Sequence, residues 1–415
     1  MERGDKMLNE VSIMLLQFRV KNYFSIGDEI TLDLTAGKGR EHKDFVIEKN
    51  GIKILPVISM YGGNASGKSN IINAIQDMFG NILASHTYGT NKQFAATPFL
   101  YNEELSDEST ECEIFFGLGI HEYQYGYKAT SEKVYEEWLY YRRLSPNDTI
   151  VKTVFERSGD TIQFSGVYKN FERYNDLINE NSLVLSVLGN RKLKQPSKNE
   201  KVFISIVEWA KGNIAYSITH MFKHDTLYEL YYNSEKLKNS ALKFLQEFDP
   251  SIEDIEVLVE KNEKGKPVYD VFTKHRGKLF PIYIESAGTQ KLFELHASIA
   301  TALQKKSLTL VYDELDSYLH PLILRRIVSM FHNKEINIMN SQLIFTSHNL
   351  TLLNRKELRR DEIWFVEKDE NEYTTTYSLD SFKSTKDEVR ADLDYGKHYL
   401  SGRFGAIPYA KAGGR

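Results

Sequence analysis

Apolar and polar residues follow two different periods in the first part of the chain. Residues 15–24 and 29–34 alternate with a period of two, and they predict a pair of strands. Residues 52–61 are apolar with few charges, which is typical of a strand that is buried on both faces. Residues 70–83 place Ile and Met at helical spacing. The pattern therefore predicts a buried strand that is followed, after a short loop, by a helix.

The middle of the chain changes from strand-like to helical patterns. Between residues 110 and 164, runs rich in Tyr, Phe, Val and Ile alternate with turn residues, and they predict an antiparallel β lobe. Residues 170–250 are mainly helical in pattern, without the sustained heptads of a coiled-coil arm. Strand-like runs then resume between residues 255 and 284. This order predicts a helical segment between two regions that contain strands.

Composition limits the class of protein but not its activity. Charged residues make up 27% and hydrophobic residues 41% of the 415 residues, as in ordinary soluble domains. The net charge of −4 does not indicate nucleic acid or an anionic membrane, although it is compatible with a local basic patch. Cys112 is the only cysteine, so an intrachain disulfide and a cysteine-based zinc site are excluded. Since no apolar run has membrane-spanning length and residues 1–10 hold no signal core, we expect a cytoplasmic protein with no membrane segment.

The loop between the buried strand and its helix carries the first chemical motif. Residues 62–69, Gly-Gly-Asn-Ala-Ser-Gly-Lys-Ser, fit the phosphate-binding pattern G-x-x-x-x-G-K-[ST]. Glycines let the backbone curl so that successive amides point at phosphate oxygens. Lys68 would place its positive charge on the β- and γ-phosphates, and Ser69 would offer its hydroxyl to Mg²⁺. The predicted nucleotide contacts in this loop are Gly62, Gly63, Asn64, Ala65, Ser66, Gly67, Lys68, Ser69 and Asn70.

Two further apolar strands end in polar side chains. The strand over residues 308–312 is followed by Asp313 and Glu314. In an α/β sheet such a strand brings both carboxylates to the carboxyl edge, where ligands bind. We expect Asp313 to hold Mg²⁺ and Glu314 to polarise the attacking water. The strand over residues 343–347 ends in His348, and although a lone histidine there is more often structural, the other motifs favour a catalytic role for it.

A fourth motif, Ser286-Ala-Gly-Thr-Gln290, lies shortly before the Asp-Glu strand. Ser and Gly at the start of a helix present a hydroxyl and amides to an anion. The motif resembles the signature of ABC-type ATPases, usually Leu-Ser-Gly-Gly-Gln, with Glu285 and Ala287 replacing the leucine and the first glycine. With all four motifs in this order, the chain resembles ABC-type ATPases, in particular the soluble branch that includes RecF, SMC proteins and OLD-family ATPases.

This resemblance implies that two chains share each nucleotide. Ser286, Gly288 and Gln290 would contact the γ-phosphate of ATP bound by the other subunit, which implies a head-to-tail homodimer or a higher homo-oligomer with sandwiched ATP. Asp316 resembles a residue of the family's dimer-contact loop. His348 matches the switch histidine that hydrogen-bonds the γ-phosphate. ATP and Mg²⁺ are therefore the expected cofactors, and Mg²⁺-dependent ATP hydrolysis is the expected reaction.

Two parts of the expected site are not fixed by these motifs. ABC-type ATPases place a glutamine between the phosphate loop and the signature, where it senses Mg²⁺ and water. Gln93 is the candidate for this metal site, and Gln76 on the phosphate-loop helix fits less well. Residues 22–25, Asn-Tyr-Phe-Ser, resemble the stretch that lies near the base in relatives, and a strand core explains them equally well.

The fold class that the resemblance implies is α/β, with an ABC-type P-loop ATPase core, an antiparallel β lobe and a helical insertion. Residues 14–168 would form the N-terminal half of the core with the phosphate loop and the β lobe. Residues 169–250 would form the helical insertion. Residues 251–415 would form the C-terminal half, with the signature, the Asp-Glu strand, His348 and the tail.

Within this branch, the chain resembles stand-alone bacterial ATPases of the AAA_15 type, which often belong to phage-defence and abortive-infection systems. The phosphate loop, residues 313–321 and the tail 398–408 carry this resemblance, and the glycines of the tail indicate turns rather than a helix. It implies a nucleotide-dependent sensor or scaffold for a separate effector protein, such as a nuclease or toxin.

Three alternatives remain open from the sequence. A RecF-like or SMC-like DNA-binding ATPase in DNA repair would use a basic cluster in the helical segment, although a solvated surface explains these charges as well. The cluster consists of Arg191, Lys192, Lys194, Lys198 and Lys201. A fused nuclease would need Asp392 and Asp394 as metal ligands, and the remaining chain leaves little room for it. A transporter subunit is the third alternative, and nothing in the sequence indicates a membrane partner.

Overall fold

A five-stranded sheet lies at the centre of the computed structural model, which describes residues 13–39, 41–88, 93–217, 224–382 and 394–407. Its strand order is β14-β15-β5-β16-β17. The first four strands are parallel, and β17 pairs antiparallel with β16 at one edge. The bounds are β5 Val57–Tyr61, β14 Thr309–Tyr312, β15 Gln342–Thr346, β16 Ile363–Lys368 and β17 Thr374–Ser378.

Both faces of this sheet are buried, as the apolar runs predict. In β5, Val57 and Tyr61 belong to the hydrophobic core on one face, and Ile58 and Met60 belong to the core on the other. All five residues of β5 are therefore removed from water, which favours a near-continuous apolar sequence. This strand leads directly into the phosphate loop.

A second sheet of seven antiparallel strands forms the β lobe, in the order β10-β9-β8-β7-β6-β1-β2. The bounds are β1 Ile13–Lys21, β2 Ile30–Asp33, β6 Thr110–Leu118, β7 His121–Ala129, β8 Val134–Arg143, β9 Lys152–Ser158 and β10 Thr161–Phe164. The predicted α/β class with an antiparallel β lobe is confirmed. The N-terminal strand pair belongs to this lobe.

The apolar run over residues 52–61 is divided rather than continuous. A hairpin of β3 (Ile47–Lys49) and β4 (Ile52–Ile54) ends before β5 begins. Pro56 lies between β4 and β5, and it has no backbone N–H to donate to a strand ladder. The single strand expected here is therefore two.

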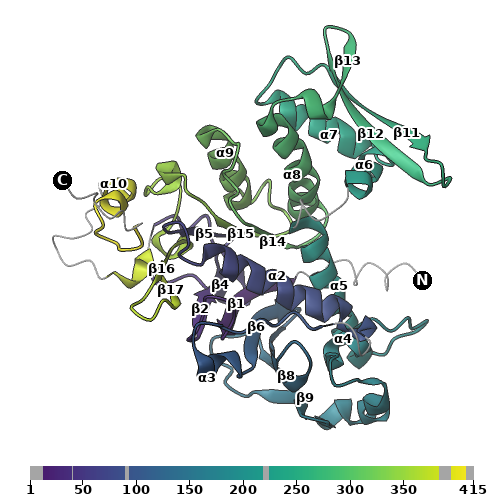
Figure 1. Cartoon of the computed structure of the whole chain (residues 1–415), viewed down its shortest axis with the longest axis vertical. Helices are drawn as coiled ribbons and strands as arrows, with labels where there is room; N and C mark the ends of the chain where they lie inside the picture. The colour runs from purple at the N-terminus through teal and green to yellow at the C-terminus, as the bar shows by residue number, and fades with distance from the viewer. Residues whose placement is uncertain (1–12, 40, 89–92, 218–223, 383–393, 408–415) are drawn as a thin grey trace.

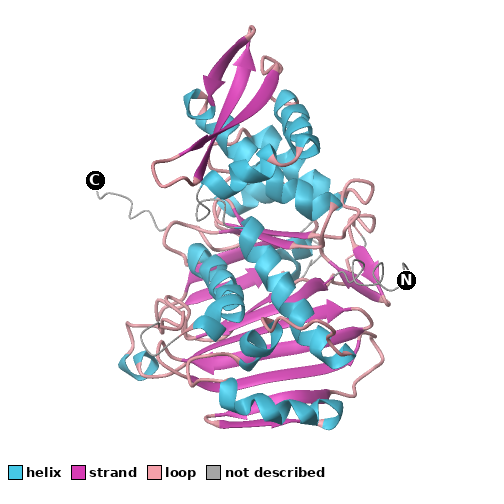
Figure 2. Cartoon of the chain, turned by 90° about the vertical axis from the view of Figure 1, so that its right-hand side faces the viewer, coloured by secondary structure: helices cyan, strands magenta, loops and turns pink. Residues whose placement is uncertain are grey.

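Helix α2 (Lys68–Ala84) lies between the two sheets (Figures 1 and 2). Its apolar face contributes Ile71, Ile75 and Met78 to the core that the five-stranded sheet and the β lobe share. The helix is thereby held on both sides, and its first residue is Lys68 of the phosphate loop. The core thus fixes the position of that loop.

The helices after the β lobe pack in two places. Helices α4 (Val184–Gly189) and α5 (Lys198–Ser217) contact α2, and α5 also contacts β14. Helices α6 (His224–Tyr232) and α7 (Glu235–Gln246) instead contact a three-stranded sheet at the top of Figure 1. That sheet consists of β11 Asp254–Lys261, β12 Pro267–His275 and β13 Lys278–Pro281. The three-part division of the chain into domains stays a prediction.

Four further helices complete the described part of the fold. They are α3 Glu103–Ser106, α8 Ala287–Gln304, α9 Pro321–His332 and α10 Tyr395–Leu400. Short 3₁₀ segments are η1 Ser85–Thr87, η2 Gly166–Leu177, η3 Ile282–Ile284, η4 Leu350–Leu352, η5 Arg360–Glu362 and η6 Leu379–Ser381. None of the described helices combines the length and the apolar character that a bilayer-spanning segment needs.

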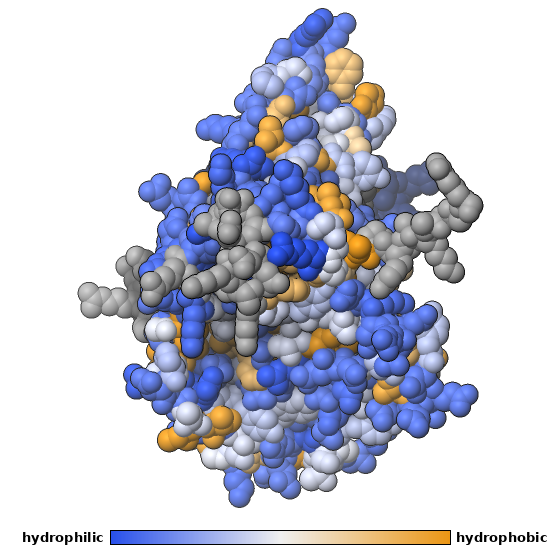
Figure 3. All heavy atoms as spheres, turned by 90° about the vertical axis from the view of Figure 1, so that its left-hand side faces the viewer, coloured by the Kyte–Doolittle hydropathy of each residue, from blue (hydrophilic) through white to orange (hydrophobic). Residues whose placement is uncertain are grey.

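The tail is only partly as its glycines predict. Helix α10 begins at Tyr395, where the side chain of Asp394 accepts a hydrogen bond from the N–H of Lys397 and so caps the helix. Turns follow it, with φ of 74° at Gly402 and 70° at Gly405. The face of the molecule that carries α10, on the left-hand side of Figure 1, is mostly hydrophilic with scattered apolar side chains (Figure 3). The expectation of turns without a helix was therefore wrong for the first part of the tail, because an N-cap starts a short helix there.

Candidate functional site

The phosphate loop is shaped by close contacts with the neighbouring strands β16 and β17. A Cβ atom on Gly67 would lie 1.9 Å from Oγ1 of Thr374, and one on Gly62 would lie 2.2 Å from the backbone oxygen of Val366. Gly67 also has φ of 103°, a conformation that favours glycine. No side chain caps the start of α2 at Gly67, so the first amides of the helix remain available to an anion.

Lys68 is folded against its own loop. Its Nζ donates hydrogen bonds to the backbone oxygens of Gly62 and Gly63, each at 2.9 Å. Burial lowers the pKa of Lys68, and the neighbouring carboxylates of Asp313 and Glu314 counteract part of this shift. A phosphate at the loop would add the negative charge that this buried ammonium favours.

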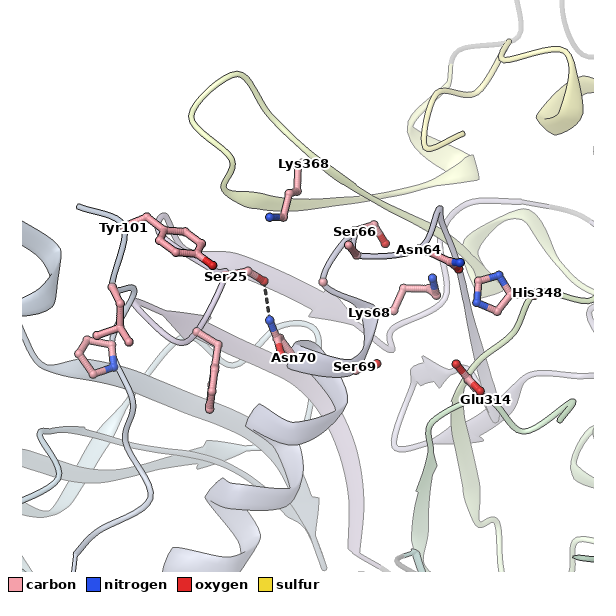
Figure 4. Close-up of a pocket in the computed structure, with 15 residues that line it drawn as sticks. Ser25, Asn64, Ser66, Lys68, Ser69, Asn70, Tyr101, Glu314, His348 and Lys368 are labelled. Atoms are coloured by element: carbon pink, nitrogen blue, oxygen red, sulfur yellow. Dashed lines mark hydrogen bonds between the residues drawn. The ribbon is translucent and has the colours of Figure 1, made fainter. Parts of the chain in front are cut away.

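The loop opens into a cavity of about 570 Å³, a volume in the range of small-ligand sites. Residues 64–70 line one wall, and Glu314 and His348 line the same end (Figure 4). Gly62, Gly63 and Asp313 are not among the lining residues. The N–H of Gly63 instead donates to the backbone oxygen of Ala406 at 3.0 Å.

The turn after β14 is held by the end of β15. The N–H of Glu314 donates to Oγ1 of Thr346 at 2.7 Å, and that hydroxyl donates to Oδ1 of Asp313 at 2.5 Å. Glu314 has φ of 46°, a strained conformation that these contacts stabilise. Nζ of Lys291, from α8, donates to the backbone oxygen of Glu314 at 3.0 Å. Both carboxylates are exposed to solvent, so they are accessible to a metal ion or a water molecule.

His348 lies at the end of β15, on the same edge as the acidic turn. Its backbone N–H donates to Oδ2 of Asp316 at 3.1 Å, and its ring is exposed toward the cavity. The carboxyl ends of the parallel strands β5, β14 and β15 therefore bring together three of the four sequence motifs.

The signature-like motif lies outside this cavity. Oγ of Ser286 accepts a hydrogen bond from the N–H of Thr289 and caps α8, as an N-cap residue does. Nε2 of Gln290 donates to the backbone oxygen of Glu285 at 2.7 Å, which fixes the approach to the helix. Ser286, Gly288 and Gln290 do not line the cavity next to the phosphate loop. Within one chain, the helix start therefore faces solvent.

The glutamine expected to sense Mg²⁺ is not placed by the geometry. Gln93 is exposed and is not among the residues that line the cavity. Nε2 of Gln76 donates to the backbone oxygen of Val311 at 3.5 Å, so Gln76 lies beside the strand that carries Asp313. The role of either glutamine stays a prediction.

Part of the stretch 22–25 lies at the opposite end of the cavity. Phe24 and Ser25 line it, and Oγ of Ser25 accepts a hydrogen bond from Nδ2 of Asn70 at 2.6 Å. Asn22 and Tyr23 are buried and hold the local backbone: Nδ2 of Asn22 donates to the backbone oxygen of Leu105 at 2.8 Å. Asn22 and Tyr23 therefore belong to the core, while the proximity of Phe24 and Ser25 to a nucleotide base stays a prediction.

The far wall of the cavity contains residues that the sequence did not indicate. Tyr101 is 78% exposed and lines the cavity together with Pro98, Leu100 and Lys368 (Figure 4). Aromatic and apolar side chains, with a cation beside them, fit the base and sugar of a nucleotide whose phosphates lie at residues 64–70. The loop of residues 97–101 has no motif, and tertiary contacts bring it here: the N–H of Phe24 donates to the backbone oxygen of Thr97, and the N–H of Phe99 donates to Oδ1 of Asn22.

These residues fit a magnesium nucleotide. Amides at a helix start and a lysine suit phosphate oxygens, and Mg²⁺ prefers hard oxygen ligands with one or two carboxylates. Ser69 lines the cavity, and Asp313 directly precedes Glu314, which also lines it. These two side chains would hold the ion.

Comparison with known proteins identifies the family. Residues 57–354, more than half of the chain, match the model of AAA_21, described as "AAA domain, putative AbiEii toxin, Type IV TA system". The chain belongs to the AAA_21 family. The broader assignment to AAA/ABC-type ATPases is thereby confirmed, and the AAA_15 grouping stays a prediction. No curated protein matches the chain.

Solved structures of SMC heads are similar in part. The SMC head domain from Thermotoga maritima has 16% identity and a TM-score of 0.41, and the similarity covers 88% of this chain and 98% of that one. The Smc head domain of Pyrococcus furiosus, in a structure with the C-terminal domain of ScpA, has 14% identity and a TM-score of 0.40, covering 88% of this chain and 96% of that one. At these values the likeness carries no functional argument.

Residues of the alternative functions lie elsewhere. Arg191 pairs with Glu200 and lies 3.8 Å from the ring centre of Tyr174, so this member of the basic cluster has structural partners. Lys192, Lys194 and Lys198 are exposed. Asp392 lies outside the described residues, and Asp394 caps α10. Burial raises the pKa of the Cys112 thiol to about 12, which keeps it protonated and unreactive.

Proposed function

We propose that this protein binds and slowly hydrolyses ATP with Mg²⁺, and that the bound ATP joins two copies of the chain head to tail. The observation that carries the proposal is the arrangement at the sheet edge. Residues 64–70, Glu314 and His348 line one cavity, while the signature-like start of α8 faces solvent outside it. Family membership supports nucleotide binding.

Each side chain has a distinct task in this proposal. The amides of residues 64–69 and the ammonium of Lys68 bind the phosphates. Ser69 and Asp313 would hold Mg²⁺, which would supply positive charge to the phosphate oxygens. Glu314 orients the attacking water and accepts its proton. The ring of His348 donates a hydrogen bond to the γ-phosphate. Thr346 supports both acidic residues from the neighbouring strand.

The exposed surface around the signature-like motif supports a second copy as the partner. Tyr283 and Tyr318 are 74% and 77% exposed, and Ile284 and Leu322 are also exposed. Tyr318 lies against the motif, since a Cβ atom on Gly288 would come within 2.9 Å of its backbone oxygen. Covering these apolar side chains favours association. A second copy would cover these exposed side chains and would bring the γ-phosphate of its bound ATP to Ser286.

Complementation between two inactive variants tests this arrangement. Lys68→Ala removes the phosphate contact, and Ser286→Asp keeps a good N-cap while adding a charge that repels the γ-phosphate. Each variant alone should hydrolyse little ATP. An equal mixture should recover about a quarter of the native rate, because about half of the pairs are mixed and each mixed pair has one intact site.

The matched control is Ser286→Asn, which caps the helix without a charge and should retain most of the activity. A mixture that is no more active than its two components would show that Ser286 does not act across subunits. Native protein that neither binds nor hydrolyses ATP would refute the whole proposal.

We also propose that the nucleotide-bound pair controls a separate effector protein in defence against phages. The resemblance of the loop, the 313–321 segment and the tail to defence ATPases supports this role, as does the toxin-system description of the family. Glu314→Gln should retain ATP and the paired state. Affinity purification of this variant from its native lysate, with Lys68→Ala as the matched control, should recover a defined protein with Glu314→Gln alone. Recovery of DNA without a protein would instead favour the DNA-repair alternative.

A further inference from the structure

The C-terminal tail returns to the phosphate loop and contacts it directly. The backbone oxygen of Ala406 accepts hydrogen bonds from the N–H of Gly63 at 3.0 Å and from the hydroxyl of Tyr399 at 2.9 Å. The N–H of Ala406 donates to Oε2 of Glu367 at 2.6 Å. Ala406 is buried, with φ of 53°. Its peptide is therefore held from three sides in a conformation that an alanine rarely adopts.

The residues before Ala406 are fixed on the strands that flank the loop. The hydroxyl of Tyr377, in β17, donates to the backbone oxygen of Phe404 at 2.7 Å. The ring of Phe404 stacks on Phe365 in β16, with 5.5 Å between the ring centres. A Cβ atom on Gly405 would lie 2.5 Å from the hydroxyl oxygen of Tyr377 and 2.9 Å from Oε2 of Glu367, so an alanine there would displace the two side-chain ends that hold the segment.

The other end of the same segment contacts the region that follows His348. The N–H of Gly396, in α10, donates to the backbone oxygen of Leu353 at 2.9 Å, and α10 packs on η4. Only one residue separates η4 from His348. Residues 395–406 therefore contact both the phosphate loop and the region after His348, which are far apart in the sequence.

We propose that residues 395–406 are a strap that positions the phosphate loop for nucleotide binding. The strap accepts the hydrogen bond of the Gly63 N–H and so fixes the backbone at Gly63. This backbone leads directly into residues 64–69, whose amides would bind the phosphates. The position of Lys68 depends on the same backbone, because its Nζ donates hydrogen bonds to the backbone oxygens of Gly62 and Gly63. The strap does not contact the cavity, and its residues are positioning residues. This inference rests on the proposed ATP binding.

Two glycine variants with the same backbone strain test the strap. Gly405 and Gly265 have φ of 70° and 73°, so an alanine strains the backbone equally at both. Only at Gly405 does the new Cβ atom meet other atoms within 4 Å. Gly405→Ala should therefore displace Ala406, whereas Gly265→Ala, in the turn between β11 and β12, should not.

The measurements are ATP affinity by titration of the full-length protein, amide hydrogen exchange at Gly63, and thermal unfolding. Relative to Gly265→Ala, we expect Gly405→Ala to bind ATP about tenfold more weakly, as for the loss of one or two hydrogen bonds, and to exchange the Gly63 amide faster. Equal ATP affinity in the two variants would overturn the strap. Absence of ATP binding by the native protein would refute the proposed function instead.

A smaller change keeps the test decisive if Gly405→Ala does not fold. Tyr399→Phe removes only the hydroxyl that donates to Ala406, and we expect about threefold weaker ATP binding with faster exchange at Gly63. Its matched control is Tyr231→Phe, outside the strap, whose buried hydroxyl also donates to a backbone oxygen at 2.9 Å, that of Phe293. Unchanged affinity and unchanged Gly63 exchange in Tyr399→Phe would overturn the proposal. A loss of thermal stability alone, without either change, would count equally against it.

Discussion

Thr346→Val tests how the acidic turn is supported. Thr346 is fully buried at the end of β15, where its hydroxyl accepts from the N–H of Glu314 and donates to the carboxylate of Asp313. Valine has nearly the same shape but no hydroxyl. The substitution therefore leaves both groups of the turn without their partner and opens no large cavity.

The expected cost follows from the two bonds. The bond to the Glu314 amide is neutral and contributes about 1 kcal/mol, and a bond to a charged group contributes about 1.5–3 kcal/mol. Asp313 is exposed, so water replaces part of its bond and the lower end applies. We expect Thr346→Val to reduce the free energy of unfolding by about 2–3 kcal/mol. Hydrolysis per folded molecule should fall at least about tenfold, because Glu314 loses its fixed position.

Thr309→Val is the matched control. Thr309 is equally buried on the neighbouring strand β14, and its hydroxyl makes a single neutral bond to Oε1 of Gln342 at 3.2 Å. It should lose about 1 kcal/mol of stability and keep its hydrolysis rate. Urea unfolding and steady-state hydrolysis at saturating ATP measure the two effects. The reasoning is refuted if both variants lose the same stability, or if Thr346→Val hydrolyses ATP at the native rate.

Two further outcomes follow from the cavity wall and from a buried histidine. Tyr101→Ala should weaken ATP binding about three- to tenfold, since one aromatic contact is lost, whereas the exposed Tyr135→Ala on β8 should not; equal affinities in a titration would exclude Tyr101 from the base site. Burial lowers the pKa of His296 to about 4, so the folded protein keeps it neutral while the unfolded chain takes up a proton near pH 6.5. The stability of the fold is therefore unaffected by this histidine above pH 6.5. As the pH falls from 7 to 4.5, protonation of the unfolded chain lowers the free energy of unfolding by about 2–3 kcal/mol. His296→Gln should flatten this part of the stability curve in urea unfolding, and a curve that stays as steep would contradict the assignment.

Local patterns made the phosphate-loop end of the candidate site predictable. The phosphate loop, Glu314 and His348 each follow an apolar strand directly, and the parallel sheet brings the ends of such strands to one edge. Tyr101 and Lys368 could not be found in this way. They reach the cavity through tertiary contacts, such as the hydrogen bond from the N–H of Phe24 to the backbone oxygen of Thr97, and no motif precedes them.

The tail shows a different limit of sequence reasoning. Its glycines correctly indicate the turns at Gly402 and Gly405, but their composition does not reveal which atoms the turns contact. The contacts are backbone atoms of Gly63 and Ala406, and backbone atoms are common to every residue type. A hydrogen bond between backbone atoms therefore cannot be predicted from the residue types that make it. The neighbouring Gly405 is the one indication in this turn, because a side chain there would meet Tyr377 and Glu367.

The signature-like motif is the converse case, because its residues are recognisable in the sequence but do not line the cavity of their own chain. Ser286 caps α8 and faces solvent, and the cavity beside Lys68 does not include it. A single chain therefore explains the motif only as a helix cap, a role for which Asn or Asp serves as well as Ser. The exposed tyrosines beside it, Tyr283 and Tyr318, have no role in that reading. The proposed second copy would explain both features at once, because one contact would bury the tyrosines and bring a γ-phosphate to the helix start.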